Sequence, residues 1–530
     1  MRSIPFLLAA AVIASIPAAA QEVTPIVTTG EGQVQGLEDE GIDAFYGLRY
    51  AAPPTGDRRF QPPVAPEAWQ GVYDATAKGA PCMQLYTPSG PVQTEQTRRI
   101  QSIFPTYGEA KIDNEDCLFL NVWTPDAESG SRPVMVWFHG GGYDYGSGNW
   151  PAYDGRNLAE KGDVVVVTVN HRLNAFGYLN LAEKFGDDFA ASGNLGNLDL
   201  VRSLEWVRDN IAAFGGDPDN VTIMGESGGG SKVSHLMAMP SADGLFHKAI
   251  VQSGPGVRSG NAGEAADYAD AILAEAGVGT VADLQNLPAE DLLAAVRRAT
   301  LASAGFGQGP RFGPIADGTV IPRDPFLPAA PEQSADIPLL IGYNKDEMTL
   351  FLAAQPEFGR SDEAMLDAMT AQMGDQATAL VAAYREMRPD YSPTHIASAA
   401  LGARFVQGTY LLADQQARSA TAPVYAYRLV WETPVAGGML KAPHTLDIPL
   451  MFDNAAESAA LVGDGEDAAT MAAIMSDAWI AFAKTGRPSS ELLPEWRPYT
   501  THTRYVMDLD VQSLLVSDPE APVRTLTGAN

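Results

Sequence analysis

The chain of 530 residues contains only two cysteines and has neither a Cys-x-x-Cys pair nor a His-Glu-x-x-His motif. Because such patterns supply the ligands of common metal sites, the sequence predicts no metal and no other cofactor. Positive charge is also scarce: 35 Lys and Arg residues stand against 65 Asp and Glu residues, a net charge of −30. This balance argues against nucleic acid and anionic lipid as partners.

The chain has a single apolar run of the kind found in targeting segments, and it lies at the N-terminus. A positive charge at Arg2 precedes the apolar residues 4–16, and the small residues 18–20 match an A-x-A cleavage site. The run is too short to span a bilayer comfortably, and no other window approaches a transmembrane helix. The sequence therefore predicts a signal peptide over residues 1–20 and an exported protein, periplasmic or extracellular, over residues 21–530.

Low-complexity linkers, internal repeats and breaks in composition are also absent, which favours one large domain. Apolar runs typical of buried strands alternate with helical patterns, and this order predicts an α/β fold with a mostly parallel central sheet and helices on both faces. The strand-like runs are 134–138, 164–169, 221–224, 248–251, 338–342 and 423–430. Alanine-rich helical insertions, of the kind that build a lid or the walls of a gorge, lie between the later strands. They cover about 263–276, 281–302, 362–388 and 393–419.

Residues 225–229 read Gly-Glu-Ser-Gly-Gly, follow the apolar run 221–224 and precede a segment that suits the start of a helix. A G-x-S-x-G sequence between a strand and a helix is typical of a nucleophile elbow, a tight turn that lifts its serine above the edge of a sheet. Glycines flank the serine because a Cβ would collide with neighbouring backbone in so sharp a turn. In this context the pattern predicts Ser227 as a nucleophile.

A second glycine-rich segment follows the run 134–138 and reads His-Gly-Gly-Gly-Tyr over residues 139–143. Acyl transfer passes through a tetrahedral intermediate with a negatively charged oxygen, and backbone N–H groups aimed at that oxygen stabilise it. A flexible loop is the alternative interpretation of consecutive glycines. Together with the elbow, however, the segment predicts an oxyanion hole formed by the N–H groups of Gly141, Gly142 and Gly228.

A serine nucleophile needs a general base, and the chain order Ser, acid, His that accompanies this elbow selects among seven histidines. Two of them precede Ser227, two follow it too closely to leave room for an acid-bearing strand, one lies in a predicted helix and one in a polar C-terminal stretch. In chain order these six are His139, His171, His235, His247, His395 and His502. The seventh, His444, follows a glycine-containing loop and precedes the apolar run 448–452, so it is the predicted base.

The acid is expected between the serine and the histidine in the chain. Strand-like residues 337–342 lead into Asn-Lys-Asp-Glu at 344–347. A carboxylate there would hold the imidazole in one tautomer and stabilise the imidazolium ion as it forms. Spacing alone does not choose between Asp346 and Glu347, and both stay open at this point.

Further long motifs extend through the chain beyond the elbow and the glycine-rich loop. They are Tyr-Gly-Leu-Arg-Tyr-Ala at 46–51, Glu-Asp-Cys-Leu-Phe-Leu-Asn-Val at 115–122, Val-Asn-His-Arg-Leu at 169–173, Leu-Glu-Trp-Val-Arg-Asp-Asn-Ile at 204–211, Phe-Gly-Gly-Asp-Pro at 214–218 and Phe-Ala-Lys-Thr-Gly at 482–486. With these motifs the chain resembles the type-B carboxylesterases, which have the α/β-hydrolase fold and include the cholinesterases and the neuroligins. The resemblance covers nearly all of the chain after the predicted signal peptide, although the family usually has tyrosine in place of His171.

The resemblance implies a role for each residue that matches a family motif. The family's G-E-S-A-G pattern implies Ser227 as the nucleophile, and its H-x-x-E/D pattern implies His444 as the base. Its N-K-D-E pattern implies Glu347 rather than Asp346 as the acid. Because no position of this Ser-Glu-His triad is lost, the resemblance argues against a non-catalytic member of the family.

The resemblance also concerns residues around the triad. It implies that Glu226 lines the site and that Asp447 is a carboxylate behind the histidine. Gly228 departs from the family, which mostly has alanine there, but the oxyanion donor at this position is a backbone N–H. Cys82 and Cys117 fall where the family has its first disulfide, and the predicted export signal is consistent with that pairing.

Residues and resemblance together predict a serine hydrolase that cleaves small-molecule carboxylic esters through an acyl-enzyme intermediate. Hydrolysis of amides, carbamates or thioesters on the same machinery is the alternative reaction. A partner-binding protein that retains the fold is the alternative class. The sequence fixes neither the oligomeric state nor the acyl and alcohol specificity, since the side chains of a binding pocket come from variable loops.

Overall fold

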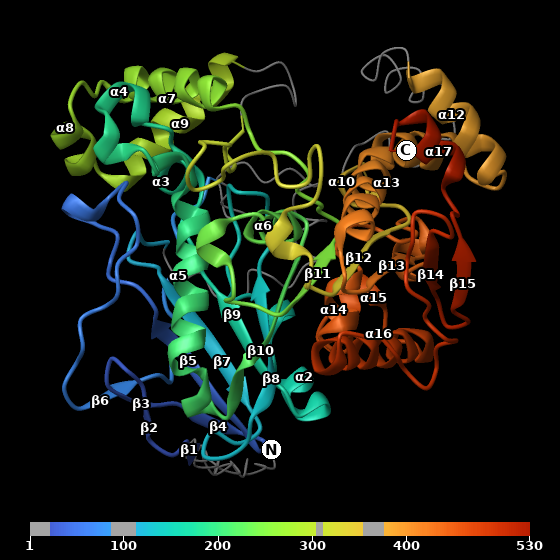
Figure 1. Cartoon of the computed structure of the whole chain (residues 1–530), viewed down its shortest axis with the longest axis horizontal. Coiled ribbons are helices and arrows are strands. Elements are labelled where there is room, and N and C mark those ends of the chain that lie inside the picture. The colour runs from blue at the N-terminus through green and yellow to red at the C-terminus, as the bar shows by residue number, and fades with distance from the viewer. Residues whose placement is uncertain (1–21, 86–112, 304–310, 353–375, 530) are drawn as a thin grey trace, which may run out of the picture.

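The protein was analysed as a computed structural model that describes residues 22–85, 113–303, 311–352 and 376–529 (Figure 1). Within these ranges the chain forms a twelve-stranded sheet in the order β1-β4-β5-β7-β9-β8-β10-β11-β12-β13-β14-β15. A separate three-stranded sheet consists of β2 (Val27–Thr28), β3 (Gln33–Gln35) and β6 (Val72–Asp74). The predicted signal peptide, residues 1–20, lies outside the described residues.

Seven neighbouring strands form the parallel part of the large sheet. In sheet order they are β9 (Val165–Val169), β8 (Arg132–Phe138), β10 (Gly216–Glu226), β11 (Lys248–Gln252), β12 (Leu339–Asn344), β13 (Val424–Leu429) and β14 (Tyr505–Leu509). The first six coincide with the six apolar runs of the sequence to within a few residues at each end, which confirms those predictions. Strands of a parallel sheet are buried on both faces, and they therefore appear as continuous apolar runs.

The outer strands of the large sheet are antiparallel, and the sequence analysis did not predict them. On one side these are β1 (Glu22–Val23), β4 (Leu37–Asp39), β5 (Ile42–Arg49) and β7 (Phe119–Thr124), and on the other side β15 (Leu514–Ser517). The predicted α/β-hydrolase architecture is thus present, with its parallel centre flanked by antiparallel edges.

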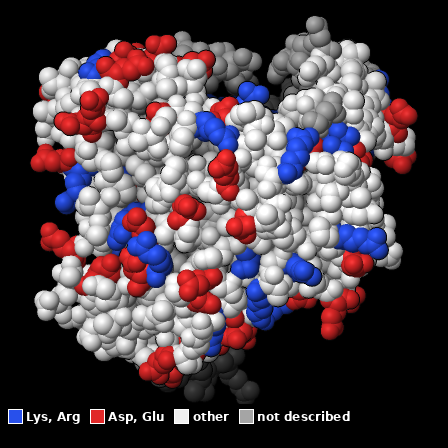
Figure 2. All heavy atoms as spheres, in the orientation of Figure 1, with Lys and Arg blue, Asp and Glu red and all other residues white. Residues whose placement is uncertain are grey.

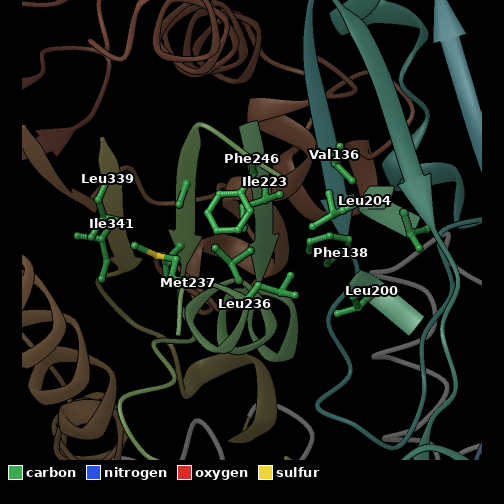
Figure 3. Packing of buried hydrophobic residues seen from close by; sticks show 14 of the residues in the cluster. Val136, Phe138, Leu200, Leu204, Ile223, Leu236, Met237, Phe246, Leu339 and Ile341 are labelled. Atoms are coloured by element: carbon green, nitrogen blue, oxygen red, sulfur yellow. The ribbon is translucent and has the colours of Figure 1, made fainter. Parts of the chain in front are cut away.

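Helices cover both faces of the sheet, and alternate residues of each strand pack against them. On β8, Val136 and Phe138 face one core, with Leu200 and Leu204 from α5 (Leu195–Asn210) and Leu236 from α6 (Gly228–Leu236) (Figure 3). On the same strand, Met135 and Trp137 face the opposite core, which α2 (Arg156–Gly162), α14 (Asp447–Met451) and α16 (Glu466–Thr485) complete. Because both faces of the sheet are buried, the central strands are held rigidly, and the candidate site residues follow their C-terminal ends.

Two groups of helices extend beyond the sheet, at the upper left and upper right of Figure 1. The first comprises α3 (Asn174–Tyr178), α7 (Ala262–Ala276), α8 (Val281–Asn286) and α9 (Ala289–Ser303), and the second α12 (Gln376–Met387), α13 (Pro393–Ser419) and α17 (Ala521–Leu526). The stretch predicted as one helix over 281–302 is two helices, because Pro288 disfavours a helical conformation at Leu287. Of the predicted helix 362–388, residues 362–375 lie outside the described residues. In the described ranges, no helix has the length and apolar character needed to cross a membrane.

Cys82 and Cys117 form a disulfide between two buried segments, as the family resemblance implied. The bond closes a loop with a sequence separation of 35 residues. In the chain-entropy model, a loop of this size stabilises the folded state by roughly 3–4 kcal/mol, because it restricts the unfolded chain. Neither cysteine belongs to the predicted triad, so removing the bond is expected to change stability more than chemistry.

We therefore predict that the double variant Cys82→Ser, Cys117→Ser unfolds at a lower temperature than the parent and keeps most of its kcat while folded. Thermal unfolding followed by circular dichroism measures the first quantity, and ester hydrolysis well below the unfolding temperature measures the second. The parent protein treated with a reductant is the matched control. An unchanged unfolding midpoint would contradict the stabilising role of the bond.

Candidate active site

Ser227 lies in the turn between β10 and α6, as the sequence predicts for a nucleophile elbow. Its backbone has φ 57° and ψ −122°, a conformation that residues with a Cβ rarely adopt. The neighbouring Glu226 and Gly228 are buried, whereas Ser227 is partly exposed. The strained turn thus presents one hydroxyl group at the C-terminal edge of the parallel strands.

Close backbone contacts explain the glycines on both sides of this turn. A Cβ on Gly225 would lie 2.5 Å from the carbonyl carbon of Gly229, and one on Gly229 would overlap the carbonyl oxygen of Phe138. No side chain fits at either position. The sequence therefore had no other residue available for so tight a junction between β8, β10 and α6.

The glycine-rich segment 139–142 follows β8 and runs beside the elbow. A Cβ on Gly140 would lie 3.4 Å from the Cβ of Ser227, and Gly141 and Gly142 have φ angles of 82° and 60°. A Cβ on Gly228 would lie 2.6 Å from the Cα of Gly142. The glycine found where the family mostly has alanine thus permits a close approach of the loop to the start of α6.

Lys232 connects the same two segments from within the core. It lies on α6, is fully buried and donates a hydrogen bond from Nζ to the carbonyl oxygen of His139 at 2.8 Å. Burial lowers the pKa of its ammonium group to about 7, although the Asp144 carboxylate opposes the shift. The rings of His139 and His171 stack 4.7 Å apart, and their own burial, together with the charge of Lys232, holds the pKa of both well below the usual range.

His444 lies in the loop before α14 and contacts a carboxylate through each ring nitrogen. Nδ1 lies 2.5 Å from Oε2 of Glu347, and Nε2 lies 3.2 Å from Oε1 of Glu226. Glu347 is oriented by the backbone N–H of Asn344, which donates to its Oε1 at 2.8 Å. In the described part of the chain, no hydrogen bond joins the Ser227 hydroxyl to His444.

The neighbouring Asp346 points elsewhere. Its carboxylate pairs with Arg388 at 3.3 Å and accepts a hydrogen bond from the Tyr391 hydroxyl at 3.1 Å. Both partners of the Asp346–Arg388 pair are buried. The structure therefore places Glu347, and not Asp346, against His444, a distinction that spacing in the sequence left open.

Asp447 is the first residue of α14, three positions after His444, and belongs to a buried polar network. Its carboxylate accepts hydrogen bonds from Gln252 at 2.8 Å, from Tyr427 at 2.9 Å and from Asn344 at 3.2 Å. It contributes negative charge near the imidazole without touching it. Asp447 thus helps to raise the pKa of His444 by its charge alone.

The carboxylates control the protonation of the histidine. Burial alone would lower the pKa of His444, but the charges of Glu226 and Glu347 outweigh it and raise the pKa to about 9. Burial also raises the pKa of Glu226, and to a smaller degree that of Glu347, whose partner His444 opposes the shift. The three groups form one coupled, buried set of charges.

Two aromatic rings border the imidazole, and the sequence analysis did not identify them. Phe351 of α10 (Thr349–Leu352) lies 5.2 Å from the His444 ring, and Phe405 of α13 lies 5.4 Å from it. Both come from helical insertions between the later strands, a region where periodicity indicates a buried face but not what that face contacts. Among the described residues, no three His, Cys, Asp or Glu side chains cluster as a metal site requires.

A parallel sheet whose strand β10 ends in a serine elbow, next to a glycine-rich loop and a histidine–carboxylate pair, defines an α/β-hydrolase. The chain belongs to the carboxylesterase family, whose model matches residues 23–521. It is 38% identical to the para-nitrobenzyl esterase of Bacillus subtilis (strain 168) over 503 residues, 94% of this chain and 97% of that protein. It is 35% identical to the phenmedipham hydrolase of Pseudarthrobacter oxydans, over 89% of this chain and 92% of that protein.

Solved structures agree with these relatives. The crystal structure of a Geobacillus stearothermophilus carboxylesterase at pH 6.2 matches with a TM-score of 0.80 and 37% identity, and the match covers 94% of this chain and 99% of that chain. A solved structure of a PNB esterase matches with a TM-score of 0.79 and 35% identity, and the match covers 95% of this chain and 99% of that chain. The protein is therefore a carboxylic-ester hydrolase.

Proposed function

We propose that Ser227, His444 and Glu347 form the catalytic triad of this hydrolase and that its reaction passes through an acyl-enzyme. The observation that carries the proposal is the buried contact between Glu347 and His444, at 2.5 Å, beside a serine in a strained elbow. A carboxylate on Nδ1 fixes the tautomer whose Nε2 can accept a proton. The triad would thus be assembled from the ends of β10 and β12 and from the loop before α14.

In the proposed reaction, Ser227 Oγ attacks the ester carbonyl carbon while His444 Nε2 accepts its proton. The tetrahedral intermediate collapses when the C–O bond to the alcohol breaks, and His444 returns the proton to that alcohol. A water molecule then attacks the acyl-enzyme by the same route and releases the acid. Nε2 lies 3.2 Å from Oε1 of Glu226, so the protonated imidazole can donate a hydrogen bond to this carboxylate. In the neutral imidazole the same nitrogen is free to accept the Ser227 proton.

The intermediate's oxygen would be stabilised by the backbone N–H groups of Gly141, Gly142 and Gly228. Support comes from the close approach of Gly228 to Gly142 and from the space in front of Gly142, where a Cβ would meet none of the described atoms within 4 Å. Donors fixed before the reaction lower the barrier because they need no reorganisation as charge develops.

A burst experiment tests the acyl-enzyme. Rapid mixing with a chromogenic ester is expected to release alcohol in a burst equal to the concentration of active sites, followed by a slower steady rate set by hydrolysis of the acyl-enzyme. Matched amide, carbamate and thioester substrates test the alternative reactions on the same machinery. Turnover with no covalent acyl-serine by mass spectrometry, under conditions in which deacylation is slow, would contradict the mechanism.

We also propose that residues 1–20 are an export signal and that residues 21–530 constitute the mature, exported catalytic domain. The disulfide supports this proposal, since such bonds persist in oxidising compartments. N-terminal sequencing of protein recovered from the periplasm or the medium tests it. Recovery of an intact N-terminus from the cytoplasm alone would contradict it.

The pH dependence of the reaction follows from the pKa of His444. The imidazole accepts a proton only when it is neutral, so kcat/KM is expected to be low below its pKa and to rise as the pH passes about 9. Glu226 raises this pKa, and Glu226→Gln should therefore shift the midpoint of the rise to lower pH. Exposed Glu332 supplies the matched control, because Glu332→Gln removes the same charge away from the site. An unshifted midpoint in Glu226→Gln would contradict the assignment.

A further inference from the structure

A cavity of about 260 Å³ lies beside the start of α6 and the end of the glycine-rich loop, and none of the proposed triad residues is among its described lining residues. Its wall includes Ser231, one turn after Ser227 on α6, and Tyr143, which follows the glycine-rich loop. The hydroxyl groups of these two residues lie 2.7 Å apart and join the two walls. Because Ser231 lies one helical turn from Ser227, we expect a substrate group a few bonds from the scissile carbonyl to extend toward this cavity.

Two arginines in the cavity wall have no partner among the described residues. Arg258, which follows β11, and Arg311, which precedes the strand-like segment at 315, both line it and are exposed. Within the described ranges, neither guanidinium group forms a hydrogen bond or an ion pair. Among the described lining residues the single carboxylate belongs to Glu264, so these residues carry a net charge of +1 in a chain whose overall charge is −30.

A third arginine extends this positive region towards the triad. Arg404 of α13 donates a hydrogen bond to Met348 Sδ at 3.6 Å and has no carboxylate partner among the described residues. Burial and the charge of Arg311 lower its pKa, whereas Glu347 raises it. Burial raises the pKa of Asp144, beside the glycine-rich loop, to about 6, and the charge of Arg311 opposes this shift. Arg311 thus interacts electrostatically with Asp144, beside the glycine-rich loop, and with Arg404, near the triad.

The rest of the lining is largely aromatic or aliphatic. It includes Tyr178, Leu179, Tyr268, Phe312 and Ile315. Such a wall suits a short hydrocarbon segment, and the arginines at its edge suit an anionic end. The combination matches a substrate with an apolar chain that ends in an anion.

We propose that this cavity is a subsite for a carboxylate, and that the enzyme favours esters that carry a carboxylate group a few bonds from the scissile carbonyl. The inference rests on the proposed function, because it names the substrate class of the same site. The guanidinium group presents parallel N–H donors that match the two oxygens of a carboxylate. Local positive charge is required because the strongly acidic chain, whose Asp and Glu side chains are spread over the face in Figure 2, otherwise repels anions.

Two matched pairs of esters test the proposal. In one pair the charge is on the acid side, as in mono-4-nitrophenyl glutarate against 4-nitrophenyl pentanoate. In the other pair it is on the alcohol side, as in the acetate ester of 4-hydroxybutanoate against butyl acetate. For each pair the measured quantity is the ratio of kcat/KM for the anionic ester to that for the neutral ester. The parent is expected to favour the anionic member of at least one pair.

The double variant Arg258→Gln, Arg311→Gln should lower that ratio by about tenfold, the scale expected for two partly exposed charge pairs. The matched control is Arg297→Gln, which removes an exposed charge from α9, outside the cavity, and should leave the ratio unchanged. In the parent, raising the ionic strength to about 0.5 M should reduce the ratio, since salt screens exposed charges. This measurement needs no variant.

The outcomes separate this inference from the function on which it depends. Equal ratios in the parent, the double variant and the control, for both pairs of esters, would overturn the carboxylate subsite while leaving the esterase intact. A salt-independent ratio in the parent would do the same. Absence of turnover of all four esters would instead contradict the proposed function.

Discussion

Replacing Ser227 with alanine is expected to lower kcat by about 10⁴–10⁶-fold, because the variant loses the atom that forms the acyl-enzyme. The remaining rate would come from substrate binding and the oxyanion donors alone. The fold should not change, since the side chain is partly exposed and forms no hydrogen bond within the described residues. Steady-state hydrolysis of a chromogenic ester measures the loss, and the thermal unfolding midpoint checks the fold.

A second serine on the same helix supplies the control. Ser234 is buried on α6 and donates a hydrogen bond to the carbonyl oxygen of Gly230 at 2.8 Å, outside the proposed site. Ser234→Ala should keep kcat within a small factor of the parent. An organophosphonate should label Ser227 in the parent and in this control and leave Ser227→Ala unlabelled. Near-normal kcat in Ser227→Ala would refute the nucleophile assignment.

The second large effect separates two adjacent carboxylates. Glu347→Gln should lower kcat by about 10³–10⁴-fold, because it removes the charge that stabilises the imidazolium ion and no longer fixes the tautomer. Asp346→Asn should leave kcat largely intact and instead lower stability by about 3–5 kcal/mol, the usual result of breaking a buried ion pair such as that with Arg388. One variant therefore changes the rate and the other the unfolding midpoint.

Activity assays and denaturant unfolding of both variants decide the matter. Each variant is the other's control, since both replace a buried carboxylate by its amide at neighbouring positions. The reverse ranking, with the larger loss of kcat in Asp346→Asn, would assign the acid to Asp346. The contact between Glu347 and His444 would then be structural.

The sequence predicted the centre of the fold more successfully than its edges. Strands such as 165–169 are buried on both faces, so their composition alone identifies them. The outermost strands, as at 37–39 and 514–517, are short or half-exposed, and their patterns do not differ from those of loops. The strands β5 and β7 are mostly buried, and the sequence analysis missed them as well. The predicted helix 281–302 is interrupted at Pro288, and the high alanine content of the segment led the sequence analysis to predict one continuous helix there.

For the candidate site, the limit of prediction was geometric. Ser227 and the glycine-rich loop could be identified because tight backbone packing permits few alternatives there. Asp346 and Glu347 are adjacent in the chain yet their side chains point to Arg388 and His444, and no spacing rule contains that information. The carboxylate of Glu226 beside His444 Nε2 became apparent only from the packing of β10 against the loop before α14.

The buried Lys232 has a consequence for the protons that the chain carries when it folds. Its folded-state pKa of about 7 lies below the ordinary 10.5, so between these values folding releases a proton and its contribution to stability rises with pH. For His444, at about 9 against 6.5, folding binds a proton and the contribution to stability falls as the pH rises. From pH 7 to pH 9 the opposite slopes, each of about 1.4 kcal/mol per pH unit, cancel. Folding in this range moves one positive charge from the lysine to the histidine, and calorimetry in buffers of different ionisation enthalpy should detect no net proton exchange from the pair.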